Sequence, residues 1–129
     1  MAGAKKWVDN ISASIYSNTH MAKELSPIAI DMIAERFRIL SEPARLRILH
    51  LLQNGELSVN SLTALLGTSQ PNASKHLKIL QDAGIVGREQ RGNSVYYSII
   101  DSSIFELCEL VCGSLETRFR EKAEVFASI

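Results

Sequence analysis

Cysteine, proline and tryptophan are scarce in this chain of 129 residues, which has two, three and one of them. Two cysteines cannot form a disulfide framework, and in a reducing compartment both would start as thiols. No apolar run reaches the roughly 18 residues that a membrane-spanning helix needs. Lys5 and Lys6 are followed by Trp7 and Asp9 rather than by an apolar segment, so a secretory signal is not expected. These absences predict a cytoplasmic protein without a membrane partner.

Signatures of catalysis are also missing. The sequence contains no glycine-rich phosphate loop, no His-Glu-x-x-His motif and no nucleophile elbow, so we do not expect an enzyme. An excess of one charge is missing too, because 14 basic residues balance 14 acidic ones. Residues 36–91 nevertheless hold eight basic and four acidic residues, whereas the two ends together hold six and ten. A basic middle between acidic ends is compatible with binding to nucleic acid.

The length and an apolar share of 46% fit a single small domain. Residues 1–20 are polar and weakly periodic, which predicts a flexible N-terminal arm with at most a helical turn near residues 7–16. The domain itself is expected at residues 21–129. A chain this short buries only a modest core, so dimerisation would be a natural source of further stability.

Helical periodicity starts at the segment Ser26–Leu40, where Ser26 can cap the helix and Pro27 suits its first position. A second helix is expected after Ser41, a further candidate cap, with Pro43 in the first turn and an end at Asn54-Gly55. This second helix is apolar almost all round, at positions such as Leu46, Ile48, Leu49 and Leu52, which predicts a place in the middle of the domain.

Two shorter helices follow around a tight turn. The first is expected at Val59–Leu66, with Leu62, Leu65 and Leu66 pointing inward, and Gly67 ends it. Ser69 can cap the second, whose Leu77, Ile79 and Leu80 anchor it to the core until a left-handed Gly84 ends it.

A change of period from helix to strand follows at Ile85–Ile99, with the glycine-bearing loop Arg91–Ser94 in its middle. This predicts a β-hairpin. Asp101 is then expected to cap a last helix, with an apolar stripe through Ile104, Leu107, Cys108, Val111 and Leu115. A helix-turn-helix followed at once by a hairpin predicts a mainly α-helical fold with a small β-hairpin wing, the winged helix-turn-helix.

The helix after Ser69 has the side chains that the major groove of DNA requires. Its polar front combines amides, hydroxyls and a lysine, which can bond to base edges, while its leucines fix it from behind. The hairpin would add phosphate contacts as a wing. The candidate DNA-binding residues are Ser69, Gln70, Asn72, Ser74, Lys75, His76, Lys78, Arg88, Arg91 and Asn93. His76 could instead pack against the wing, and a winged helix can also serve as a protein-interaction module without operator binding.

Three ordered segments closely resemble the ArsR/SmtB family of transcriptional repressors. They read FRILSEPARLRIL at Phe37–Leu49, SQPNASKHLKILQDAGIV at Ser69–Val86 and RGNSVYY at Arg91–Tyr97. The resemblance covers about residues 28–112. It implies a homodimer paired through the first and last helices that binds double-stranded DNA at a palindromic operator. It also implies release from the operator when a metal, a metalloid or an oxidant is sensed.

The metal sites of well-known relatives are not expected in this chain. Where some relatives carry two cysteines in the helix before the turn, this chain has Ser58 and Asn60. Other relatives bind zinc on the last helix, and the matching positions here are Asp101, Ser103, Ser114 and Thr117. Of those four ligands only the aspartate remains, so we predict that this zinc site is missing.

Cys108 and Cys112 remain as candidate effector-sensing thiols, because residues four apart share one face of a helix. Two thiolates in this arrangement could hold arsenite or another soft metal ion, or react with oxidants or reactive sulfur. Equally, they could be small apolar residues in the dimer interface. His20 and His50 are expected to be ordinary residues rather than ligands.

Overall fold

The computed structural model describes residues 24–127, so the predicted N-terminal arm lies outside the described residues. By its internal contacts the chain divides into two units, one that ends at Glu35 and one that starts at Arg36. The first unit contributes the N-terminal part of helix α2, and the core and the candidate site lie in the second. Among the described residues, no helix is long and apolar enough to cross a membrane.

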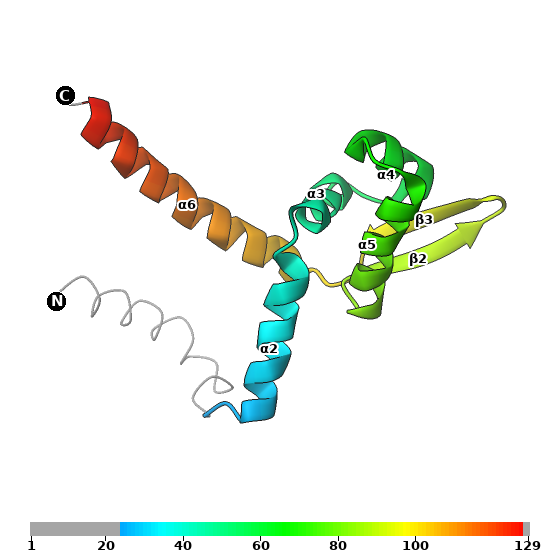
Figure 1. Cartoon of the computed structure of the whole chain (residues 1–129), viewed down its shortest axis with the longest axis horizontal. Helices are drawn as coiled ribbons and strands as arrows, with labels where there is room; N and C mark the ends of the chain where they lie inside the picture. The colour runs from blue at the N-terminus through cyan, green and yellow to red at the C-terminus, as the bar shows by residue number, and fades with distance from the viewer. Residues whose placement is uncertain (1–23, 128–129) are drawn as a thin grey trace. The chain divides into compact units, whose positions relative to one another are not determined.

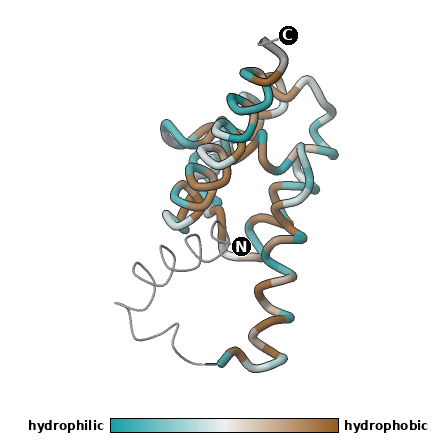
Figure 2. The backbone as a smooth tube through the Cα atoms, turned by 90° about the vertical axis from the view of Figure 1, so that its left-hand side faces the viewer, coloured by the Kyte–Doolittle hydropathy of each residue, from teal (hydrophilic) through white to brown (hydrophobic). Residues whose placement is uncertain are grey.

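Helices α2 (Pro27–Leu40) and α3 (Pro43–Leu52) begin as the two prolines predict. The Ser26 hydroxyl accepts a hydrogen bond from the Ala29 amide at 3.1 Å, which confirms it as a cap. The prediction that Ser41 caps α3 was wrong, because Glu42 occupies the N-cap position and the Ser41 hydroxyl donates to the Arg38 carbonyl instead. Figure 2 shows apolar and polar residues alternating along α2, as in an amphipathic helix.

Helices α4 (Val59–Leu66) and α5 (Gln70–Asp82) form the helix-turn-helix. Gly67 has φ +65° and Gly84 has φ +74°, left-handed conformations that glycine adopts without a steric penalty. Both helices therefore end where the sequence predicts. The two helices pack side by side, and α5 also packs on the first strand of the hairpin (Figure 1).

The wing is a three-stranded antiparallel sheet with the order β1-β3-β2. Strands β2 (Val86–Arg91) and β3 (Ser94–Ile99) form the predicted hairpin around Gly92-Asn93. The strand β1 (Leu57–Ser58) pairs with Tyr96 and Tyr97 of β3. A strand of two residues carries no periodicity from which this pairing could be inferred.

The core lies between α3, α4, α5 and the base of the wing. Its fully buried members include Ile48, Leu62, Leu77, Leu80 and Ile85. Two leucines that the sequence pattern placed in the core are exposed instead: Leu46 is 41% exposed and Leu65 is 56% exposed. Conversely, Arg45, whose charge alone would suggest an exposed position, is buried.

The last helix, α6 (Ser103–Ala127), begins at the predicted cap. The Asp101 carboxylate accepts hydrogen bonds from the Ser103 amide at 3.1 Å and from the Ser103 hydroxyl. Along the predicted stripe, Ile104 is buried, whereas Val111 and Leu115 are each 50% exposed. The apolar face of α6 is thus largely uncovered in the single chain.

Candidate nucleic-acid interface

Helix α5 has a buried back and an exposed polar front. Ala73, Leu77 and Leu80 are fully buried on the back and fix the helix against the core. The front exposes Gln70, Asn72, Lys75 and Lys78, while Ser74 is half-buried. The Ser69 hydroxyl accepts a hydrogen bond from the Asn72 amide at 3.3 Å, so Ser69 caps the N-terminus of the helix as predicted.

The polar side chains of this front differ in whether a neighbouring side chain holds them. The Asn72 side chain donates from Nδ2 to the Thr68 hydroxyl at 2.8 Å, which orients its amide before any base is met. Lys75 has no ion-pair partner within residues 24–127, whereas Lys78 lies 3.5 Å from the Asp82 carboxylate. Asn72 is therefore suited to a fixed hydrogen-bond geometry, and Lys75 to a phosphate or a base edge.

His76 lies on the buried back of α5 rather than on its exposed front. It is buried, and its Nδ1 accepts a hydrogen bond from Arg45 Nε at 3.3 Å. Arg45 also donates from Nη1 to the Ile39 carbonyl at 3.1 Å. Burial and the neighbouring Arg45 guanidinium lower the pKa of His76, which favours the neutral imidazole that accepts this bond. Sequence reasoning missed Arg45, since no local pattern reveals a partner on another helix.

The three predicted residues of the wing are all exposed, but only Arg91 among them has an ion-pair partner in the described part of the chain. Arg88 and Asn93 are exposed. Arg91 is also exposed, but it pairs with the Glu56 carboxylate, and its guanidinium lies 3.9 Å above the Tyr96 ring centroid. The hydrogen bond to Glu56 raises the pKa of Arg91. Arg91 therefore has a carboxylate partner that a DNA phosphate would have to replace.

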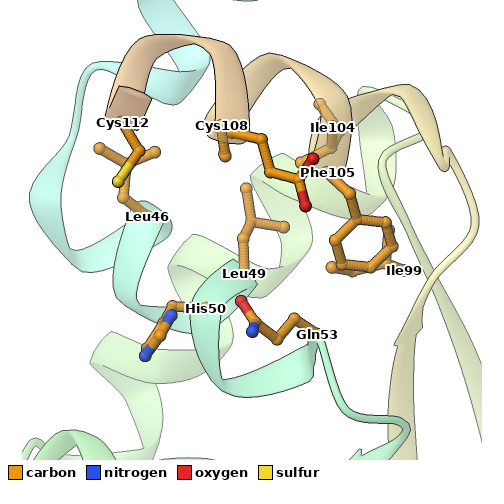
Figure 3. Close-up of a pocket in the computed structure, with 10 residues that line it drawn as sticks. Leu46, Leu49, His50, Gln53, Ile99, Ile104, Phe105, Cys108 and Cys112 are labelled. Atoms are coloured by element: carbon orange, nitrogen blue, oxygen red, sulfur yellow. The ribbon is translucent and has the colours of Figure 1, made fainter. Parts of the chain in front are cut away.

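The two thiols of α6 are exposed and border two clefts. One cleft, of about 510 Å³, lies between α6 and α3 and is lined by Leu49, His50 and both cysteines, among others. Figure 3 shows the cysteines on the α6 side of this cleft, with His50 and Gln53 on the α3 side. The described residues hold no cluster of three His, Cys, Asp or Glu side chains placed to bind a metal. Within residues 24–127, the thiols are therefore a pair without a third such ligand.

Comparison with known proteins identifies the arrangement. The family model described as "Bacterial regulatory protein, arsR family" matches residues 42–87. The arsenical resistance operon repressor of Bacillus subtilis is 36% identical over 93 residues, which are 70% of this chain and 84% of that protein.

Two solved structures share the fold. The crystal structure of Mycobacterium tuberculosis Rv0081 matches with a TM-score of 0.69 and 33% identity, over 77% of this chain and 99% of that one. The homodimeric winged helix-turn-helix DNA-binding domain of Mb0332 from Mycobacterium bovis matches with a TM-score of 0.65 and 28% identity, over 71% and 85%. The chain therefore belongs to the arsR family of bacterial regulatory proteins and is a DNA-binding transcriptional regulator with a winged helix-turn-helix fold.

Proposed function

We propose that this chain is a homodimeric repressor that binds a palindromic operator through α5 and is released by a thiol-reactive effector. The observation that carries the proposal is the exposed amide, hydroxyl and amine front of α5, which is backed by fully buried side chains. Such a helix keeps one orientation as it enters a groove. The B-DNA major groove, about 12 Å wide, admits an α-helix.

The proposed contacts divide by chemistry. Gln70 and Asn72 can bond bidentately to adenine, and Ser69, Ser74, Lys75 and Lys78 can bond to base edges or phosphates. Arg88, Arg91 and Asn93 would contact the backbone or the minor groove from the wing. His76, which the sequence placed among these contacts, acts in this proposal from behind, by holding α5 in place.

The proposed dimer uses a second copy of this chain to cover the apolar side of α6. Phe37, Leu46, Val111 and Leu115 are each at least two-fifths exposed and line an apolar cleft of about 580 Å³. The solved relative from Mycobacterium bovis is homodimeric, which supports this occupant. Two copies of α5 related by a two-fold axis would then reach half-sites about 34–36 Å apart along the duplex.

The proposed effector site is the thiol pair Cys108 and Cys112. Both thiols are exposed in the single chain, lie on one helix face and line the apolar cleft proposed to pair with the second copy. A relative is named for arsenical resistance, so arsenite is the first ligand to test. A third donor, where arsenite needs one, would come from outside the described single chain. Binding or oxidation at this position would disturb α6 and its packing.

Operator binding tests the proposal. Fluorescence anisotropy with the DNA upstream of the protein's own gene and with a scrambled duplex measures affinity and specificity. We expect specific binding by the wild type, and about tenfold weaker binding by Lys75→Ala with a shallower salt dependence. Arg120→Ala removes the same charge from α6 and is the control. Equal affinity for both duplexes would contradict sequence-specific recognition, and no binding to either would favour a protein-interaction module.

The thiol proposal needs a separate experiment. Operator binding by the wild type and by the double variant Cys108→Ser/Cys112→Ser is measured with arsenite, zinc and a sulfur oxidant added in turn. We expect at least one agent to release the wild type and to leave the double variant bound. A response shared equally by both proteins would place sensing elsewhere, and no response from the wild type to any agent would make the cysteines structural.

A further inference from the structure

Arg36, in the second half of α2, binds the C-terminal end of the recognition helix. Its Nη2 donates a hydrogen bond to the carbonyl of Ala83 at 3.1 Å, and Ala83 is the C-cap residue of α5. The last carbonyls of a helix have no partner within the helix and carry partial negative charge, so a cation there is favourable. Arg36 thus supplies from another helix what α5 cannot supply itself.

The same guanidinium faces the start of α6. Its Nη1 lies 3.6 Å from Oδ2 of Asp101, while Oδ1 of Asp101 accepts the cap hydrogen bonds from Ser103. Those hydrogen bonds, with a smaller effect of Arg36, lower the pKa of Asp101, so its carboxylate is charged at neutral pH. One arginine therefore bridges the negative end of α5 and the N-terminal cap of α6.

Backbone hydrogen bonds also connect the end of α5 to the start of α6, and we call this connection, with Arg36, the joint. The carbonyl of Ile85, two residues beyond Ala83, accepts the amides of Ile100 at 2.9 Å and of Asp101 at 3.3 Å. Ile85 is fully buried. The chain that leaves α5 is thus hydrogen-bonded to the chain that enters α6, and Arg36 is the side chain that binds both.

We infer that Arg36 is a positioning residue for DNA binding, which fixes the angle of the recognition helix relative to α6. This inference rests on the proposed function of α5. Helix α5 has 13 residues and is therefore about 20 Å long, so a tilt of about 5° at its C-terminal end moves its N-terminal end by ~1.7 Å. Hydrogen bonds to base edges do not survive such a shift, because donor and acceptor must lie within about 3.2 Å.

The joint also gives α6 a route to the DNA-binding front. Cys108 lies seven residues after Asp101, about two helical turns along α6. A displacement of α6 caused at the thiols would move Asp101, and through Arg36 it would move Ala83. The side chains of Arg36 and Asp101 are partly exposed, so their ion pair contributes little to stability and its loss acts mainly on geometry. Arg36 Nη1 itself is buried and makes no hydrogen bond, and the Asp101 carboxylate at 3.6 Å is its ion-pair partner.

A double-mutant cycle tests the inference with the full chain. Affinities for the operator and for a scrambled duplex, and the thermal unfolding midpoint, are measured for Arg36→Gln, Asp101→Asn and the double variant. Asn at position 101 keeps an oxygen that can accept the Ser103 amide but loses the charge. We expect Arg36→Gln to weaken operator binding about tenfold, Asp101→Asn about threefold, and the double variant no more than Arg36→Gln alone. Arg36→Lys should recover part of the loss.

The control is Arg47→Gln, which removes the same charge from an exposed arginine of α3. Equal losses for Arg36→Gln and Arg47→Gln, strictly additive effects in the cycle, or a fall in the unfolding midpoint that accounts for the lost affinity would each overturn the inference. Amide hydrogen exchange needs no DNA and separates this inference from the proposed function. Arg36→Gln and Asp101→Asn should both raise exchange at residues 83–85, and unchanged exchange there would overturn it even if operator binding is confirmed.

Discussion

Arg45 of α3 and His76, on the buried back of α5, form a polar pair inside the protein. Helix α5 is the helix proposed to read DNA. Arg45 Nε donates to His76 Nδ1, and Arg45 Nη1 donates to the Ile39 carbonyl at the end of α2. Polar groups inside a core are costly unless they are hydrogen-bonded, so these bonds require α2, α3 and α5 to keep one arrangement. The pair therefore adds directional hydrogen bonds to the packing of the surrounding leucines.

The first prediction concerns pH. The folded protein lowers the pKa of His76 below its ordinary value of 6.5, mainly by burial and then by Arg45. Above pH 6.5 the imidazole is neutral in both states, and below it the unfolded chain binds the proton more readily. The free energy of unfolding should therefore fall as the pH falls from 6.5 through the lowered pKa of the folded state. Thermal unfolding midpoints at pH values on either side of this range measure the loss.

His76→Asn is the informative variant, because its amide oxygen can still accept from Arg45 but does not titrate in this range. We expect a smaller loss of the unfolding midpoint on acidification than in the wild type. His50→Asn, at an exposed position of α3, is the control and should behave like the wild type. Identical pH profiles for wild type and His76→Asn would contradict the assignment.

At the scale of elements, the wing is attached to the body by an ion pair as well as by its sheet. Arg91 near the end of β2 pairs with Glu56, which lies just before β1, and covers the Tyr96 ring. On the same strand, Oε1 of Glu89 lies 4.0 Å from Nε of Arg91. The basic wing is therefore partly neutralised, and within residues 24–127 Arg88 is the basic residue of β2 without an ion-pair partner.

The second prediction is that Glu56→Gln tightens DNA binding severalfold at low salt and less at high salt. The change removes one negative charge beside the wing and frees Arg91 for a phosphate. Anisotropy titrations at several salt concentrations measure the effect. Glu116→Gln removes the same charge from exposed α6 and is the control. Weaker binding by Glu56→Gln would show that Arg91 serves the wing's structure rather than DNA.

At the scale of the whole molecule, α6 and α2 expose large apolar side chains, and their contact with water is unfavourable. Val111, Leu115 and Phe119 are each at least half exposed on one face of α6, and Phe37 of α2 is 54% exposed. A contiguous apolar surface of this kind marks a protein-interaction site. In the proposed dimer, stability depends on protein concentration.

The third prediction is that the thermal unfolding midpoint rises with protein concentration, and that Leu115→Glu abolishes this rise. A charge buried without a partner should weaken the dimer at least about 100-fold. Sedimentation velocity measures the oligomeric state. Leu110→Glu makes the same change about 140° around the helix, five residues away at about 100° per residue, and should leave the dimer intact. Equal sedimentation of both variants would place the interface elsewhere.

The sequence by itself determined most helix starts and the polar front of α5, because their causes are local. Ser26, Ser69 and Asp101 each accept an amide within three residues, and the turn at Gly67 depends on the conformation of a single residue. Hydrophobic periodicity likewise located the helices and the hairpin. It was wrong at Leu46 and Leu65, since burial depends on what packs opposite and not on spacing alone.

Only the tertiary structure decided which charges are free. Arg45 meets His76 across 31 positions, Arg36 meets Ala83 across 47, and Arg91 at the end of β2 meets Glu56, which lies just before β1. Strand β1 joined the wing for the same reason, by pairing with residues far along the chain. The sequence around an arginine does not reveal whether its side chain faces solvent or binds a distant carbonyl. Its partner exists only once the chain has folded, since long-range proximity is a property of the packed elements.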